Sequence, residues 1–170
     1  SNCESVELFL NGKSLGEKEM GDEMDLVWLV AYEPGSLVAK AKRGGVLVCT
    51  KEIETSGSPA RIQLLADRET IKADKKSVVH IEVNILDGKN RFVPDASNTI
   101  IFTIEGEARI LALDNGDPMS QESFTGNSRK AFNGKCLVII QSASESGEFN
   151  LLAESDGLAS AKIVINELSK

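Results

Sequence analysis

The sequence predicts an all-β protein made of two immunoglobulin-like β-sandwich modules in tandem, the first truncated at its N-terminus. Apolar residues recur with a period of two, as in half-buried strands; Val6, Leu8 and Leu10 are an example. Turn signals such as Asn11-Gly12 separate these stretches at short intervals. A small polar stretch closed by a proline, residues 55–59, interrupts the pattern. We therefore expect modules at residues 1–56 and 57–170.

The first segment has the pattern of five short strands, at residues 6–10, 13–18, 26–31, 37–41 and 46–53. The stretch Leu26–Ala31 is apolar on both faces, which predicts a buried central strand with Trp28 in the core. About 55 residues are marginal for an independent core. The segment also begins inside a strand, so we expect a sandwich without its opening strands.

The second segment has about seven strands, at residues 62–66, 78–86, 98–105, 109–113, 135–142, 148–155 and 159–166. This spacing is typical of an immunoglobulin-like sandwich, although the antibody pattern of Cys, Trp and Cys is absent. A segment of roughly 110 residues can bury an adequate core.

Composition excludes several classes of partner. With 26 acidic and 19 basic residues the net charge is -7, so we expect neither nucleic acid nor an anionic membrane surface as a partner. The longest apolar runs are too short to span a bilayer. The first residues lack the pattern of a signal peptide, and the compartment is not determined by the sequence.

The cysteines and the histidine do not form a reactive pattern. Three scattered cysteines cannot supply the paired spacing of a zinc site. Cys49 and Cys136 lie in apolar runs, which predicts buried free thiols, with a Cys3–Cys49 disulfide as the alternative. His80 alternates with apolar residues and is expected on the polar face of a strand, without a catalytic partner.

We expect no catalytic residue, no cofactor and no metal in this chain. Glycoside hydrolysis needs two facing carboxylates, one protonated and one ionised, and the acids here fall in turns or on alternating polar faces. The runs 87–90 and 114–117 contain acids suited to calcium, but Asx and glycine turns explain both without a metal.

Aromatic residues are too few for a typical sugar-binding surface, at 5% of the chain. Tyr32 follows a predicted strand, where it can be exposed. A carbohydrate-binding module stays open as an alternative if Tyr32 forms a flat patch with Phe92 or Phe124. A surface adhesin is a second alternative, although adhesin arrays repeat similar modules and these two segments do not align.

Two stretches resemble a known family. Residues 1–20, with VELFLNGKSLG as the most specific part, and the pattern of Trp28, Tyr32 and Pro34 resemble the small module after the catalytic barrel of Bacteroidetes-type β-galactosidases of glycoside hydrolase family 2. The second segment is similar to the bacterial immunoglobulin-like domain that follows in these enzymes. The stretches that carry this similarity are ADRETIKAD, VPDASNTIIFTIEGEARILALDNGDP and RKAFNGKCLVIIQS.

The resemblance implies a non-catalytic accessory role. In this family the acid/base and nucleophile glutamates lie in an upstream barrel, so no catalytic residue carries over to this chain. The implied partner is that barrel, in a periplasmic or secreted parent, with a homo-oligomer and oligosaccharide contact as further options. Contact with another domain or a sugar is expected at Tyr32, Asn115, Gly116 and Asp117. Relatives tend to have a GVGNGDP-like loop where this chain has ALDNGDP.

Overall fold

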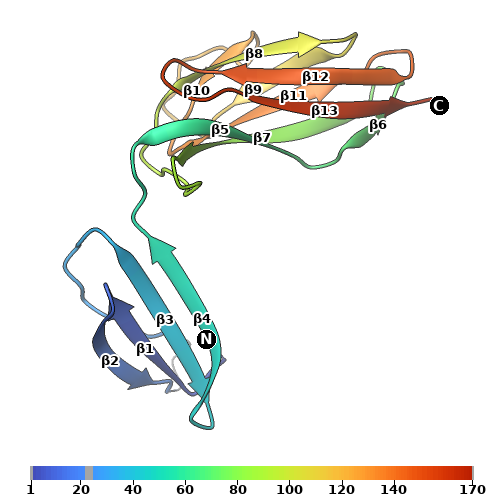
Figure 1. Cartoon of the computed structure of the whole chain (residues 1–170). Helices are drawn as coiled ribbons and strands as arrows, with labels where there is room; N and C mark the ends of the chain where they lie inside the picture. The colour runs from blue at the N-terminus through green and yellow to red at the C-terminus, as the bar shows by residue number, and fades with distance from the viewer. Residues whose placement is uncertain (1, 22–24, 170) are drawn as a thin grey trace. The chain divides into compact units, whose positions relative to one another are not determined.

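The structure is a computed structural model that describes residues 2–21 and 25–169, shown in Figure 1. The described part consists of strands and loops, which confirms the predicted all-β class. The chain divides into two compact units, Ser1–Thr55 and Ser56–Lys170. Within the described residues no helix has the length and apolar character needed to cross a membrane.

The first unit contains one four-stranded antiparallel sheet in the order β2-β1-β3-β4. Its strands are β1 (Ser5–Leu10), β2 (Lys13–Glu19), β3 (Ser36–Arg43) and β4 (Val46–Glu54). Asn11 and Gly12 join β1 to β2 with positive φ angles of 51° and 80°, the conformation that the Asn-Gly pair predicts for a tight hairpin.

The two faces of this sheet differ in chemistry because side chains alternate along each strand. One side, the polar face, carries hydrogen-bonded and ion-paired residues. Lys42 contacts Glu17 at 2.7 Å and Glu7 at 3.8 Å, and Ser14 donates to Glu7 at 2.7 Å. The opposite side, the apolar face, is formed by three rows of paired residues: Leu10–Leu37–Ile53, Leu8–Ala39–Lys51 and Val6–Ala41–Cys49.

The predicted central strand at Leu26–Ala31 is wrong. These residues have no regular secondary structure, and Leu29 is fully exposed at 100%. Trp28 is half-buried beside Lys18, whose Nζ lies 5.2 Å from the indole centroid and donates to the carbonyl of Val27 at 2.6 Å. The all-apolar run was interpreted as a strand buried on both faces, but in the described residues no second layer encloses it.

The second unit is a sandwich of two sheets, with strand orders β10-β8-β12-β13-β6 and β5-β7-β11-β9 (Figure 1). Its strands are β5 (Pro59–Ala66), β6 (Thr70–Lys72), β7 (Val78–Asp87), β8 (Thr99–Glu105), β9 (Arg109–Asp114), β10 (Ser128–Lys130), β11 (Lys135–Gln141), β12 (Gly147–Glu154) and β13 (Ala161–Leu168). The pairing of β6 with β13 is parallel and the other pairs are antiparallel. The seven strands expected from the sequence are present, and β6 and β10 are two short additions.

The core of the second unit follows the alternation of the sequence. On β7, Val79, Ile81, Val83 and Ile85 are buried, and they belong to one continuous cluster of buried residues with inward-facing residues of the opposite sheet. Burial of so many large aliphatic side chains is the main stabilising contribution, about 1.5–3 kcal/mol for each. The core thus lies in the second unit, where it supports the loops at the ends of the strands.

Candidate functional site

The predicted contact residues Asn115, Gly116 and Asp117 lie together in the loop after β9. The carboxylate of Asp114 accepts hydrogen bonds from the backbone N–H groups of Asn115 at 2.7 Å and Gly116 at 3.2 Å. The carboxylate of Asp117 accepts the N–H of Met119 at 2.9 Å. Both acids therefore shape their own turn, as Asx turns do.

A buried arginine that the sequence analysis missed holds this loop in place. Arg129 on β10 is 1% exposed, and its guanidinium donates to Asn115 Oδ1 at 3.1 Å and to the carbonyls of Glu122 and Ser123 at 3.2 and 3.3 Å. Its Nε is buried without a hydrogen-bond partner among the described residues, 3.8 Å from a carboxylate oxygen of Glu122. No sequence signal distinguishes Arg129 from a surface residue, because it stands in a run of polar residues between Ser128 and Lys130, which are both exposed.

The anchored loop presents apolar side chains outward. Phe124 is 60% exposed, with the guanidinium carbon of Arg129 at 5.3 Å from its ring centroid, and Met119 is exposed as well. An arginine beneath an aromatic ring restrains that ring by a cation–π contact. The loop can therefore offer a fixed aromatic side chain to a partner.

The remaining predicted residue, Tyr32, is 79% exposed and belongs to the first unit. Phe92 and Phe124, its expected companions in an aromatic patch, belong to the second unit. Phe92 packs near Lys135, whose Nζ lies 5.4 Å from the Phe92 ring centroid. The flat patch of Tyr32 with a phenylalanine stays a prediction.

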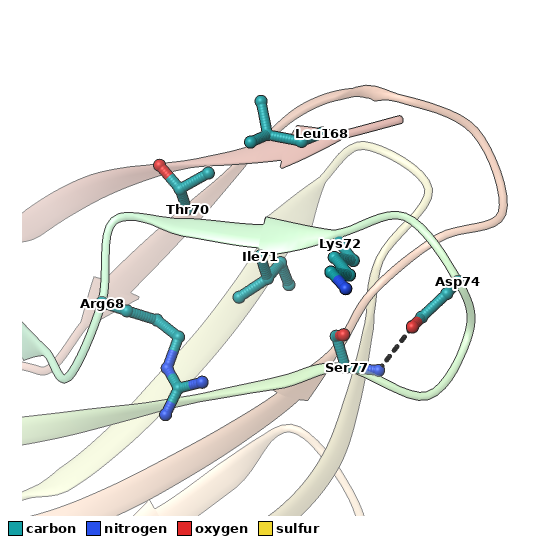
Figure 2. Close-up of a pocket in the computed structure, with 7 residues that line it drawn as sticks. All are labelled: Arg68, Thr70, Ile71, Lys72, Asp74, Ser77 and Leu168. Atoms are coloured by element: carbon teal, nitrogen blue, oxygen red, sulfur yellow. Dashed lines mark hydrogen bonds between the residues drawn. The ribbon is translucent and has the colours of Figure 1, made fainter. Parts of the chain in front are cut away.

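A shallow pocket of about 440 Å³ lies at the edge of the second unit, beside β6 and the end of β13 (Figure 2). Its lining contains one carboxylate, that of Asp74, which accepts the N–H groups of Ser77 at 2.7 Å and Lys76 at 2.9 Å. These bonds hold the pKa of Asp74 below its usual value. The Arg68 side chain is paired with Asp67 at 2.9 Å. A single ionised carboxylate without a protonated counterpart does not provide the acid and nucleophile of glycoside hydrolysis.

The carboxyl groups of the described residues whose pKa values shift clearly all shift downward. They are Glu17, Asp67, Asp74, Glu82, Asp87 and Glu105. Asp87 is the strongest case, because the backbone N–H of Gly57 and further donors from Lys89 and Arg91 hold its pKa far below the ordinary value. A general acid needs the opposite shift, toward a protonated carboxyl group at neutral pH.

The thiols are divided between core and surface. Cys136 is buried as predicted, and burial raises its pKa to about 12, which makes it inert. The prediction that Cys49 is buried is wrong: Cys49 is exposed on β4, because a single sheet leaves this edge strand open. None of the three cysteines, all of which lie in the described residues, takes part in a disulfide, so the alternative Cys3–Cys49 disulfide is not formed.

The described residues contain no group of three or more His, Cys, Asp or Glu side chains placed to hold a metal ion. His80 is half-exposed, with its Nδ1 3.6 Å from a carboxylate oxygen of Asp67.

Comparison with known proteins identifies the chain. It belongs to the glycoside hydrolase family 2 C-terminal domain 5 family, which matches residues 62–164. A domain of unknown function (DUF4982) matches residues 1–49.

The following proteins, which are similar to this chain over nearly its whole length, are glycosidases. The beta-galactosidase BoGH2A of Bacteroides ovatus is 42% identical over 167 residues, which are 98% of this chain and 20% of that protein. A solved glycosyl hydrolase family 2 member from Bacteroides cellulosilyticus has a TM-score of 0.92 at 39% identity, over 98% of this chain and 22% of its own. A β-glycosidase from Bacteroides vulgatus has a TM-score of 0.89 at 34% identity, over 97% and 21%. The chain thus spans about one fifth of the length of these relatives and resembles their C-terminal region, which confirms the family resemblance noted in the sequence.

Proposed function

We propose that this chain is a non-catalytic accessory region of a family 2 glycoside hydrolase, and that it supports the catalytic region of that enzyme structurally during carbohydrate degradation. The observation that carries the proposal is the alignment of 98% of the chain with one fifth of a β-galactosidase. The lowered pKa values of the clearly shifted carboxyl groups agree with a role outside the chemical step. We further propose that the parent enzyme is β-galactosidase-like, which the same alignment supports.

A segment exchange in the B. ovatus β-galactosidase tests this proposal. Deleting the 167 aligned residues is expected to lower the melting temperature and the yield of active enzyme, and inserting this chain in their place is expected to restore both. A deletion variant as stable and active as the intact enzyme would overturn the supporting role.

The isolated chain provides the second test. We expect no hydrolysis of a chromogenic β-galactoside by the purified 170-residue protein. Hydrolysis that is lost on substitution of an Asp or Glu of this chain would show that it carries catalytic groups itself.

A carbohydrate-binding role is the second candidate, because Tyr32 and Phe124 are both well exposed. Calorimetric titration of the chain with galacto-oligosaccharides distinguishes this role from structural support. Binding that is lost in Tyr32→Ala or Phe124→Ala would favour the carbohydrate-binding module, and no heat of binding would exclude it for these sugars.

A further inference from the structure

The apolar face of the first unit is covered only in part. Val6, Leu8 and Leu37 are half-buried, and Lys18, which pairs with Val6, contacts Trp28, but no continuous core lies behind this face among the described residues. Among its described residues, Ala41 is the one buried hydrophobic residue, and the continuous hydrophobic cluster lies in the second unit. Ile53 on β4 is 65% exposed, and all nine residues of β4 are exposed. In a sheet of this size, the free energy gained from burial does not offset the conformational entropy lost on folding unless the apolar face is covered.

The pairing register makes this face continuous. Leu10, Leu37 and Ile53 form one row across β1, β3 and β4, and the smaller residues Ala41 and Cys49 occupy another. Rows of large and small side chains give a surface into which another layer of side chains can interdigitate.

Lysines border the apolar face. By register Lys13 lies beside Leu10, and Lys51 lies beside Ala39. The described strand residues of this face include no carboxylate, because the acids of the sheet lie on the polar face. The surface therefore fits an apolar partner with carboxylates at its edge.

We propose that this apolar face is the surface through which the chain docks onto the rest of its own glycosidase polypeptide, at an apolar patch bordered by Asp or Glu residues. The inference rests on the proposed accessory function. The relatives carry this segment within chains about five times longer, and a covalently linked partner has a high effective concentration. A second copy of this chain is a poorer occupant, because a two-fold contact would place lysine-bordered faces together without acids to pair them.

Cys49 provides a direct probe of coverage because its free thiol lies on the apolar face and is exposed. We expect maleimide to label Cys49 rapidly in the isolated chain and slowly in the B. ovatus enzyme that carries this chain in place of its own segment. Cys136, buried in the second unit, is the internal control and stays unlabelled in both. Equal labelling of Cys49 in the two proteins would overturn the proposal.

Ile53→Lys tests the energetics of docking. In the B. ovatus enzyme that carries this chain in place of its own segment, here called the exchanged enzyme, this substitution is expected to lower the melting temperature by several degrees and to restore labelling of Cys49. In the isolated chain the main unfolding transition is expected to stay unchanged, because the Ile53 side chain is mostly exposed there. Ile101→Lys is the matched control on the exposed side of β8 and is expected to change neither protein. If Ile53→Lys leaves both the melting temperature of the exchanged enzyme and its labelling of Cys49 unchanged, the proposal is contradicted.

Lys51→Glu tests the charge of the border, and Thr50→Glu, one residue away and facing the polar side, is its control. We expect the exchanged enzyme to be destabilised more by the first substitution than by the second, and equal effects would remove the acidic border from the proposal.

If the isolated chain sediments as a dimer that Ile53→Lys dissociates, the occupant is a second copy. An exchanged enzyme that fails to assemble even with the unsubstituted chain counts against the accessory function itself, whereas assembly that is insensitive to Ile53→Lys counts against this face alone.

Discussion

Arg129 shows how one buried side chain orders a loop that is rich in Ser, Asn and Gly. We expect Arg129→Met to destabilise the chain by about 1–3 kcal/mol, because Asn115 Oδ1 and the carbonyls of Glu122 and Ser123 lose their donors. Urea denaturation measures the loss, and hydrogen exchange is expected to speed up across residues 115–127. Lys130→Met, at the exposed neighbouring position, is the control. Unchanged exchange in the loop would mean that Arg129 does not hold it.

Asp87 makes the stability of the second unit depend on pH. Its pKa lies far below that of an unfolded chain, so its contribution is complete at neutral pH and is lost as the pH falls below about 4. Asp87→Asn is expected to lower the melting temperature at pH 7, and the difference from the unsubstituted chain is expected to shrink between pH 4 and pH 2. Thermal unfolding followed by circular dichroism measures this. Glu105→Gln, which removes an exposed ion pair with Lys162, is expected to have a smaller effect. A difference that does not change with pH would contradict the assignment.

Among the elements, the turn between β10 and β11 requires glycine at position 134. Gly134 has a φ of +76°, and a Cβ there would lie 2.3 Å from the carbonyl oxygen of Val93. Gly116→Ala is the control, since Gly116 has a similar φ of +71° and open space around it; its cost is about 1–2 kcal/mol. We expect Gly134→Ala to cost clearly more in urea denaturation or to prevent folding, and equal costs would show that the turn adapts.

The strands of the second unit were predictable from the sequence because inward and outward residues alternate along them. In β7, Ile81 and Val83 alternate with His80 and Glu82, and the same period leads to the buried cluster. The short strands β6 and β10 were not predictable, because three residues are too few for a period to emerge. The prediction of a strand at Leu26–Ala31 failed for a different reason. An apolar run shows that a segment needs cover, but not whether the cover lies within the chain. Of the candidate site, Asn115–Asp117 was predicted as a turn, whereas Arg129, which determines its geometry, depends on a contact between distant residues.

At the scale of the whole molecule, the hydrophobic core is confined to one unit, and this predicts unequal stability along the chain. The continuous buried cluster lies within residues 56–170, and the first unit contributes none of its members. We expect a protein of residues 56–170 to unfold cooperatively, with the same main transition as the full chain, because cooperative unfolding follows from a shared core. Residues 1–55 alone are expected to show no cooperative transition, since a sheet of four strands whose apolar face is only partly covered gains too little from burial to offset chain entropy. Calorimetry of the three proteins, with sedimentation to exclude self-association, measures this. A monomeric 1–55 fragment that melts cooperatively would show that the sheet is stable without cover, and the argument for a docking face would lose its thermodynamic basis.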